Sequence, residues 1–456
     1  KVVLKMVGFL TKRESLLKRL IDHHLQTWSK QTDGKPLLLR GARQVGKTYA
    51  VRQLGRQFEQ LVELNLEKSA QGRKFFQGDL EPQEIIANIT NLFKQPITPG
   101  KTLLFLDEIQ AEPRAILALR YFYESMPNLH IIAAGSLLDF AIEAVGVPVG
   151  RVEFLYMYPL SFLEFLVALD EQFLLQAVQN HTADLPLNTV AHEQLLKLVS
   201  LYLALGGMPE VVAKWAQNRQ AAPCAKVQQS LLTAYRQDFN KYGKTTQLKY
   251  LNQLFNHIPR QLGQKFKYSQ IEGDYRKREL APCLDLLVTA GVVHKVFHTA
   301  AQGVPLGAQT DLDNFKLLYL DVGLAQAALG LELTDWLLDP AKQFVNKGAI
   351  VEAFVGQELL VYSNPTQPQE LHYWLRTERT AQAEVDYVIS IKQTIIPIEV
   401  KGGLGSTLRS MHSFLAQHPQ SPFGLRFSTQ NYHRYEQIHS YPLYAIFKAI
   451  QSDIQL

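Results

Sequence analysis

The sequence predicts an α/β protein whose N-terminal part is a parallel sheet covered by helices. Short apolar runs alternate there with stretches of helical periodicity, which is the pattern of strands joined by crossover helices. The five runs cover residues 37–39, 61–66, 103–106, 130–134 and 154–158. A glycine-rich loop directly follows the first run and opens a helical stretch, a second observation that favours this fold. After residue 339 the alternation of helix and strand returns, so we expect a further α/β domain there.

Composition and length restrict the classes of protein that remain. The chain has 456 residues, 46% of them apolar and 20% charged, which predicts about three domains and excludes disordered and collagen-like chains. Only two cysteines occur, Cys224 and Cys283, so neither a disulfide framework nor a zinc cluster is expected and a cytoplasmic location follows. No apolar run reaches the ~18–20 residues of a membrane span, and no signal-peptide pattern is present. We expect no membrane partner.

Punctuation along the chain predicts its division into domains. Residues 9–29 carry Leu and Ile at helical spacing and predict an amphipathic helix that ends at 33–36. Residues 161–205 again have helical periodicity, and 206–209 interrupt it. The expected parts are an N-terminal helix with the sheet core (1–165), a helical lid (166–225), a basic middle domain (226–338) and the second α/β domain (339–456).

The glycine-rich loop has the residues of a phosphate-binding loop, G-x-x-x-x-G-K-[ST]. It reads Gly41, Ala42, Arg43, Gln44, Val45, Gly46, Lys47 and Thr48. Glycines let the backbone N–H groups surround phosphates, and the helix N-terminus adds its positive end. Lys47 is expected to reach the β and γ phosphates, and the Thr48 hydroxyl to bind magnesium.

An acidic pair follows the third apolar run. Asp107 and Glu108 come directly after four apolar residues, 103–106, which would place them at the same sheet edge as the phosphates. Asp107 is then expected to hold magnesium, and Glu108 to orient or deprotonate an attacking water. An isolated strand that ends in a solvated turn would explain the pair equally well, but the phosphate-binding loop favours the functional interpretation.

Further motifs occur in the order found in one known family. These are Gly-x-Arg-Gln-x-Gly-Lys-Thr at 41–48, Leu-Asp-Glu-Ile-Gln at 106–110, Gly-Ser at 135–136, Gly-Arg at 150–151 and Tyr-Pro-Leu-Ser-Phe-x-Glu-Phe at 158–165. On these residues the chain resembles AAA-type P-loop ATPases, more narrowly a prokaryotic group of them. The resemblance implies binding of ATP or ADP with Mg²⁺, ATP hydrolysis and a homo-oligomer as one form of assembly.

The same resemblance implies three further roles, each with a plain structural alternative. Ser136 would be the polar sensor of the γ phosphate or attacking water, or it caps a helix. Arg151 would be an arginine finger that acts on a neighbouring subunit's nucleotide, or it forms a surface ion pair. Pro209 would pack near the adenine as part of the lid, or it belongs to a simple turn.

The net charge of +5 is concentrated in the middle domain. Residues 226–316 contain 13 Lys and Arg against 7 Asp and Glu. Residues 269–287 predict a helix-turn-helix with Arg276, Lys277 and Arg278 at the start of its second helix, and strands at 291–297 and 316–320 would form a wing. The charge alone is explained equally well by an ordinary solvated surface. The pattern resembles a winged helix and implies DNA binding, although such folds also serve as structural linkers or bind proteins.

The last domain contains two carboxylates and a lysine in a predicted hairpin. A helix at 348–362 and strands at 371–375, 384–389 and 395–400 are expected there. Glu399 and Lys401 point to one face of a strand, and Asp386 on the paired strand can lie alongside. They predict a site for a divalent metal, Mg²⁺ or Mn²⁺, or a buried ion-pair network.

This hairpin resembles the PD-(D/E)XK nuclease superfamily, in which a preceding helix supplies another acid. Glu352 is the matching residue, with Glu358 as a second choice. ATPases of the group named above commonly carry such a nuclease-like domain of unknown function at the C-terminus. The resemblance implies that ATP controls a DNA-binding and metal-dependent nuclease, with Lys401 steadying the transition state. The alternative is a switch or scaffold that does not cleave and binds DNA or a partner protein.

Overall fold

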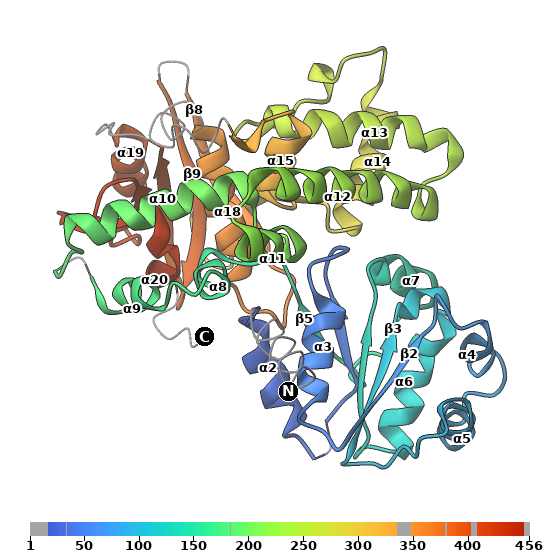
Figure 1. The fold of residues 1–456 in the computed structure, drawn as a ribbon. Coiled ribbons are helices and arrows are strands. Elements are labelled where there is room, and N and C mark those ends of the chain that lie inside the picture. Colours follow the sequence, from blue (N-terminus) through green and yellow to red (C-terminus); the bar gives the residue numbers. More distant parts are fainter. Residues whose placement is uncertain are drawn as a thin grey trace.

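The structure is a computed structural model that describes residues 17–32, 34–182, 184–334, 348–378, 381–402 and 408–450. The chain forms two lobes, which Figure 1 shows one above the other. The first lobe runs from helix α2 (Ile21–Ser29) to strand β5 (Glu153–Tyr156). The second lobe runs from α8 (Phe162–Ala168) to α20 (Ile446–Ile450). The whole chain is thus α/β, as predicted.

The first lobe is built on a five-stranded sheet in which all pairs of strands are parallel. Its strands are β1 (Leu37–Arg40), β2 (Gln60–Asn65), β3 (Thr102–Asp107), β4 (His130–Ala134) and β5. Their order across the sheet is β2-β3-β4-β1-β5. Each strand overlaps one of the five apolar runs, which confirms the predicted sheet.

Helices cover both faces of this sheet. They are α2, α3 (Lys47–Gly55), α4 (Ala70–Lys74), α5 (Pro82–Phe93), α6 (Arg114–Ser125) and α7 (Leu138–Val145). Successive residues of β1 show the two faces, because Leu37 and Leu39 pack in the core that contains α2 and α3, whereas Leu38 packs in the core that contains α5 and α6. Burial on both faces is the reason that these strands are continuous apolar runs.

The N-terminal helix is shorter than the predicted range 9–29. Within the described residues it begins at Ile21, and residues 17–20 are not helical. Two carboxylates bind backbone N–H groups at this point: Arg19 N donates to Asp22 Oδ2 at 2.9 Å, and Leu20 N donates to Glu164 Oε1 at 2.7 Å. These bonds satisfy donors that a helix start leaves free, and they fix where α2 begins. Residues 9–16 of the prediction lie outside the described residues.

The second lobe begins with helices. The predicted helical stretch 161–205 is confirmed as α8, α9 (Gln172–Asn180) and α10 (Thr189–Leu205). Asp170 at φ 65° separates the first two, and the Asn188 side chain caps the third. The helices that follow are α11 (Pro209–Asn218), α12 (Ala221–Tyr242), α13 (Leu248–His257), α14 (Lys277–Thr289), α15 (Val322–Ala328), α18 (Gly348–Val361) and α19 (Arg409–Gln417).

An eight-stranded mixed sheet forms the rest of the second lobe, in the order β12-β13-β11-β10-β9-β8-β6-β7. Its strands are β6 (Val293–Thr299), β7 (Thr310–Tyr319), β8 (Leu371–Glu378), β9 (Ala381–Ile391), β10 (Thr394–Lys401), β11 (Gly424–Ser428), β12 (His433–Tyr435) and β13 (Ile438–Pro442). The strands predicted at 371–375, 384–389 and 395–400 are therefore confirmed.

The middle of the chain differs from a separate winged helix. The strands of the predicted wing pair with each other as β6 and β7, but β6 also pairs in parallel with β8. This pairing covers the open edge of β6, so the sheet continues across the domain border predicted at 338/339. The predicted helix-turn-helix at 269–287 contains one α-helix, α14, preceded by a 3₁₀ turn at Tyr268–Gln270. Between this turn and α14, Gly273 has a φ of +124°, which interrupts the helical backbone.

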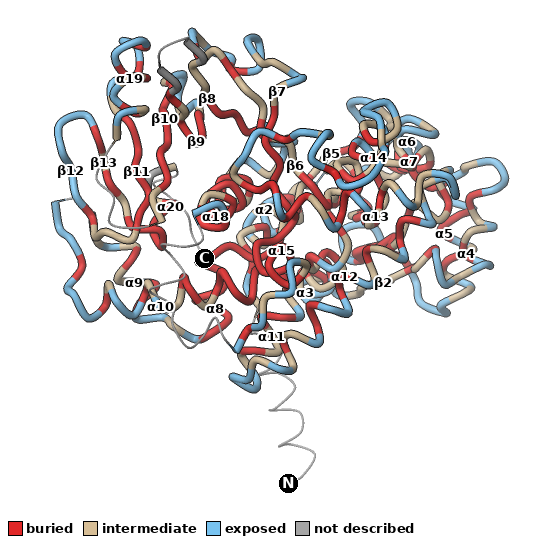
Figure 2. The backbone as a smooth tube through the Cα atoms, turned by 90° about the horizontal axis from the view of Figure 1, so that it is seen from above, coloured by how far each residue is buried: buried red, intermediate tan, exposed pale blue. Residues whose placement is uncertain are grey.

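Helix α18 lies at the centre of the second lobe. Ten of its residues are buried, including the polar Gln357 and Glu358. Figure 2 shows it as a largely buried helix surrounded by the sheet and by helices of the same lobe. Burial around most of the helix is expected for a core element. Among the described residues, no helix combines the length and the apolar character needed to cross a membrane.

Candidate functional site

The phosphate-binding loop joins β1 to α3 in the predicted strand-loop-helix arrangement. Gly41 has φ 143° and Gly46 has φ 101°, both in the region that glycine adopts most easily. A Cβ atom on Gly41 would collide with the carbonyl oxygen of Met157, which follows β5. The glycines of the motif are thus required by backbone conformation and by close packing, and α3 begins directly at Lys47.

Lys47 is turned into the loop that it would use to bind phosphate. Its Nζ atom donates to the carbonyl oxygens of Gly41 at 2.7 Å and Ala42 at 2.8 Å. Burial lowers the pKa of Lys47 to about 8, while the charges of Asp107 and Glu108 act in the opposite direction. An anion beside this ammonium group would raise its pKa again, because an opposite charge favours the ionised form.

Thr48 and Asp107, the two residues expected to hold magnesium, lie next to each other. The Thr48 hydroxyl lies 3.3 Å from Asp107 Oδ1, and Asn65 Nδ2 donates to the other carboxylate oxygen at 2.9 Å. Burial, followed by the charge of Glu108, raises the pKa of Asp107. A divalent cation would relieve both effects, so these residues fit the ion.

Glu108 stands next to this pair at the end of β3. Its backbone is left-handed, with φ 51° and ψ 47°, which turns the chain away from the strand. Its carboxylate accepts a hydrogen bond from Gln110 Nε2 at 2.6 Å. The side chain is thereby held close enough to Asp107 for the two charges to interact, as expected of a residue that acts on a water molecule there.

Ser136 follows β4, the strand that lies between β1 and β3. It lines a cavity of ≈170 Å³ together with Gly41 and Ala42 of the phosphate-binding loop. Helix α7 begins at Leu138, and its cap position is Leu137, which makes no side-chain cap bond. The alternative that Ser136 caps this helix is therefore wrong.

Arg151 does not reach the phosphate-binding loop of its own chain. It precedes β5, which is parallel to β1, and Glu153 N binds Pro36 O at the start of β1. The phosphate-binding loop lies at the opposite edge of the sheet. The Arg151 side chain is 44% exposed and forms an ion pair with Glu124 at 3.1 Å. Within one chain it thus matches the surface ion pair.

Pro209 is the first residue of α11 and lies against the phosphate-binding loop. A Cβ atom on Gly46 would be 3.5 Å from Pro209 Cγ. Proline at the first position of a helix loses no hydrogen bond. The start of the helix thus explains the residue, and its position also brings the lid to the loop.

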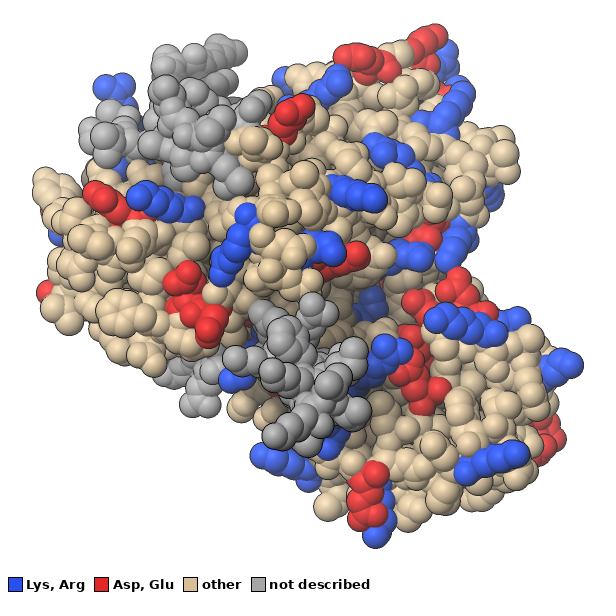
Figure 3. Space-filling model, in the orientation of Figure 1, with Lys and Arg blue, Asp and Glu red and all other residues tan. Residues whose placement is uncertain are grey.

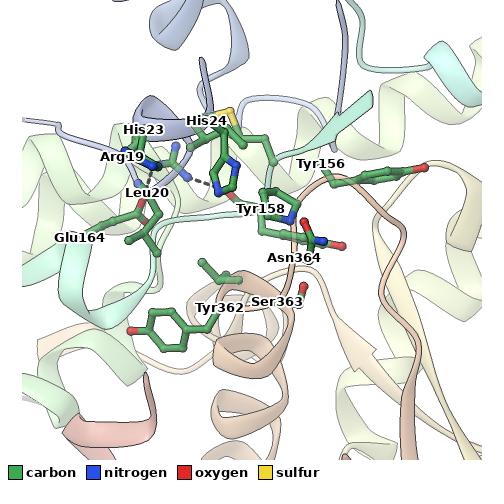
Figure 4. A pocket seen from close by; sticks show the side chains of 14 residues that line it. Arg19, Leu20, His23, His24, Tyr156, Tyr158, Glu164, Tyr362, Ser363 and Asn364 are labelled. Carbon is green, nitrogen blue, oxygen red and sulfur yellow. Dashed lines mark hydrogen bonds and ion pairs between the residues drawn. The ribbon is translucent and has the colours of Figure 1, made fainter. Parts of the chain in front are cut away.

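Sequence reasoning missed Arg19, which is buried beside the loop. It donates from Nε to Glu164 Oε1 at 2.8 Å, from Nη1 to Val45 O at 2.8 Å and from Nη2 to Tyr158 O at 2.7 Å. Figure 4 shows Arg19 and Glu164 at one side of a cavity of ≈410 Å³ where α2, the end of β5 and the end of α18 meet. Nothing local marks Arg19, because its partners are up to 145 residues away.

The second lobe also contacts the loop directly. Tyr235 on α12 donates its hydroxyl to Arg43 O at 2.5 Å, and the Arg43 side chain pairs with Asp238 on the same helix. Gly291, next to β6, lies against Ala42, with 3.5 Å between a Cβ atom placed on it and the alanine. A change in the shape of the loop would therefore alter its contacts with the second lobe as well as with the first.

Asp386, Glu399 and Lys401 come together as the sequence predicts. β9 and β10 pair from Ile391 and Thr394 to Tyr387 and Ile398, which puts Asp386 beside Glu399 in the next position of the register. Asp386 Oδ2 accepts from Val400 N at 2.7 Å, and Lys401 Nζ lies 2.6 Å from Glu399 Oε1. Burial raises the pKa of both carboxyl groups.

Glu352 joins this cluster through a lysine that sequence reasoning did not assign. Lys316 on β7 lies 2.8 Å from Glu352 Oε1 and also contacts Glu384 on β9. Burial alone would lower the pKa of Lys316. The charges of Glu352, Asp386 and Glu384 act more strongly in the opposite direction, so the pKa of Lys316 is raised. A lysine inside an apolar strand, at 316–320, was the available signal.

Glu358 belongs to a different place. Its Oε1 atom accepts from Phe162 N at 3.0 Å, at the start of α8, and Tyr362 also binds it. Burial raises its pKa to about 8. It therefore joins α18 to the start of α8 and is not part of the acidic cluster.

The acidic cluster does not fit a metal ion as it stands. Over residues 17–450, apart from the undescribed gaps, no group of three or more Asp, Glu, His or Cys side chains could hold one. Glu352 and Glu399 each have an oxygen taken by a lysine. The arrangement matches the ion-pair alternative more closely than the metal site.

The basic residues of the middle domain are exposed. Arg276, Lys277 and Arg278 all face solvent at the start of α14, and Lys277 pairs with Asp313 at 3.0 Å. Figure 3 shows basic side chains spread over the second lobe with acidic ones between them, and a hollow between the two lobes. No single basic surface is evident on this face.

Family models match three successive parts of the chain. Residues 33–166 match an AAA domain, residues 196–335 a domain of unknown function (DUF8612) and residues 347–446 another domain of unknown function (DUF4143). A search of curated proteins gave no match.

Solved structures similar to this chain include three nucleotide-related proteins. The Walker-type ATPase PABY2304 of Pyrococcus abyssi is 14% identical, with 68% of this chain and 95% of that chain covered and a TM-score of 0.44. The Aeropyrum pernix ORC1 protein in complex with DNA is 11% identical, with 70% and 94% covered and a TM-score of 0.24. AMPPCP-bound DnaA from Aquifex aeolicus is 13% identical, with 60% and 75% covered and a TM-score of 0.21. The family match and the loop geometry together show that residues 33–166 form an AAA-type P-loop domain.

Proposed function

We propose that the chain binds and hydrolyses ATP and that its nucleotide state controls a DNA-binding second lobe. One observation carries the proposal of ATP binding and hydrolysis. The Thr48 hydroxyl lies 3.3 Å from Asp107 Oδ1 beside the phosphate-binding loop, and Glu108 is the next residue along the chain. Magnesium bound there with the nucleotide would offset the charge of the phosphates.

The residues of the loop divide the work of hydrolysis. Lys47 exchanges its two carbonyl partners for phosphate oxygens, and the N–H groups of the loop hold the remaining oxygens. Glu108 orients the attacking water or takes its proton, and Ser136 contacts the γ phosphate or that water. Pro209 packs near the adenine. Arg151, exposed and remote from its own loop, acts on the nucleotide of a neighbouring copy in a homo-oligomer.

Contacts between the lobes support control of the second lobe by nucleotide. Arg43 and Ala42 of the loop touch α12 and Gly291, so a loop that closes on phosphates shifts these contacts. The exposed Arg276, Lys277 and Arg278 are the residues that we assign to DNA phosphates. The geometry favours a switch that does not cleave over metal-dependent cleavage, because the cluster at Asp386 and Glu399 does not fit a metal.

Two variants of the loop test the ATPase. Lys47→Ala should abolish binding of a fluorescent ATP analogue, because the phosphates lose their ammonium partner. Glu108→Gln should bind the analogue normally and release phosphate at least about 100-fold more slowly. Lys74→Ala, an exposed lysine on α4, is the control and should behave as wild type. Normal binding by Lys47→Ala would contradict the assigned site, and hydrolysis by Glu108→Gln would assign the base elsewhere.

DNA binding is measured on the same proteins by fluorescence anisotropy with and without ATP and Mg²⁺. Arg276→Ala with Arg278→Ala should weaken binding and reduce its dependence on salt. If wild-type affinity does not change between the two nucleotide conditions, the switch fails even where the ATPase holds.

A further inference from the structure

Lys316 is a buried cation that the proposed function leaves unused. It lies on β7, and its side chain is only 3% exposed. Its ammonium group contacts Glu352 at 2.8 Å and Glu384, and lies 5.2 Å from the centre of the Tyr373 ring. A lysine so deeply buried needs such partners, because an unpaired charge would be expelled to water.

The acids around Lys316 come from three elements that surround one space. Glu352 lies on α18, Glu384 and Asp386 on β9, and Glu399 on β10. Lys316 forms ion pairs with Glu352 and Glu384, and its positive charge also interacts with Asp386. On the other side Lys401 binds Glu399. Three of these four carboxylates are thus already paired with an ammonium group of the chain.

Arg426 adds a third positive charge at this place. It is buried on β11 and stands opposite Glu399 in the parallel register of β10 and β11. Its charge interacts with that of Glu399. A divalent cation entering between Glu352, Asp386 and Glu399 would therefore meet three fixed positive charges at close range.

We propose that Lys316 is a built-in cation that stands in place of a divalent metal in the acidic cluster of Glu352, Asp386 and Glu399. The second lobe then keeps nuclease-like residues in a metal-free, non-cleaving module. This inference goes beyond the proposed function and does not depend on nucleotide binding, since no residue of the phosphate-binding loop takes part.

One atom of the cluster remains without a partner and makes the proposal easy to contradict. Glu399 Oε2 is buried and accepts no hydrogen bond. If a metal does bind the native cluster, this oxygen can receive it without losing a hydrogen bond. Glu399→Gln is therefore the variant that identifies such binding.

The test is a titration of the full chain with Mn²⁺ in the absence of nucleotide. The electron paramagnetic resonance signal of free Mn²⁺ measures how much of the ion is bound. Wild type and Lys316→Arg, which keeps the charge, should show no saturable site below about 1 mM that depends on the cluster. Lys316→Met removes the charge at similar volume and should bind Mn²⁺ at least about tenfold more tightly. Lys316→Met with Glu352→Gln should lose that gain.

Two results would overturn the proposal. One is a wild-type Mn²⁺ site that disappears in Glu399→Gln or Glu352→Gln, because the metal would then bind despite Lys316. The other is a folded Lys316→Met protein with no gain in Mn²⁺ affinity, where near-ultraviolet circular dichroism verifies the fold. If Lys316→Met does not fold, the wild-type titration with its two Gln variants decides alone. Failure of ATP binding would leave all of these results unaffected.

Discussion

Arg43 of the phosphate-binding loop and Asp238 of α12 form an ion pair that joins the two lobes. Arg43 Nη1 lies 2.6 and 2.7 Å from the two carboxylate oxygens of Asp238. Asp238 is almost completely buried, whereas the Arg43 side chain is 35% exposed. The negative charge of Asp238 therefore lies beside the phosphate-binding loop, and the positive charge of Arg43 is already paired with it.

Asp238→Asn should release Arg43 and raise affinity for ATP. Removing one negative charge near the phosphates should lower the Kd by about threefold to tenfold. The same change should lower the free energy of unfolding by about 1–2 kcal/mol, because a buried partner is lost. Glu84→Gln, which removes an exposed acid on α5, is the control and should change neither quantity. Weaker binding in Asp238→Asn would show that the pair instead holds the loop in its binding shape.

Arg19→Met should destabilise the chain more than any exposed arginine. Its partner Glu164 is 1% exposed and would be left buried without a cation, at a cost of about 3–5 kcal/mol. Arg52→Met, which breaks an exposed pair with Glu63, should cost about 0–1 kcal/mol. Urea unfolding measures both. An equal, small effect of the two substitutions would mean that Arg19 does not hold the loop, β5 and α8 together.

Glu358 should make the chain less stable as pH rises. Its pKa is about 8 in the folded protein and near 4.5 when the chain is unfolded, so between these values the folded state binds the extra proton. The stabilisation is complete below pH 4.5 and is lost at roughly 1.4 kcal/mol per pH unit up to about pH 8. Glu358→Gln keeps an acceptor for Phe162 N and has no proton to lose.

The measurement is urea unfolding of wild type and Glu358→Gln at pH 6, 7 and 8. With each rise of one pH unit, wild type should lose roughly 1.4 kcal/mol of unfolding free energy relative to Glu358→Gln. Glu84→Gln, an exposed acid on α5, should give a difference that does not vary with pH. A constant difference for Glu358→Gln as well would show that the carboxyl group is already ionised at pH 6.

The sequence predicts those parts of the molecule in which local pattern and chemistry coincide. Leu103 to Leu106 can only be a buried strand, and Asp107 follows it at the edge where Gly41 and Lys47 must also lie. The hairpin expected from the runs 384–389 and 395–400 placed Asp386 and Glu399 on paired strands, and the structure sets their register with a two-residue turn between Ile391 and Thr394.

Partners that are distant in sequence could not be predicted. Ser161 and Glu164 form a capping box that a local pattern reveals, but nothing near Glu164 identifies Arg19 as its cation. Lys316 likewise meets Glu352 only because α18 packs between the sheet and the helices. The pairing of β6 with β8 depends on the same packing, and it joins the expected middle and C-terminal domains in one sheet.

Ser136→Ala should slow ATP hydrolysis without weakening the fold. Ser136 lines the cavity beside Gly41 and Ala42, where its hydroxyl can contact the γ phosphate or the attacking water. Loss of one such donor should lower kcat by at least about tenfold and leave KM nearly unchanged. Because α7 has Leu137 at its cap position, the unfolding free energy should fall by less than the ~1 kcal/mol of a lost cap. A normal kcat with a lower unfolding free energy would make Ser136 a structural residue.

Ser69→Ala provides the comparison, because Ser69 does cap a helix, α4, by accepting from Gly72 N. It should lower stability and leave kcat unchanged.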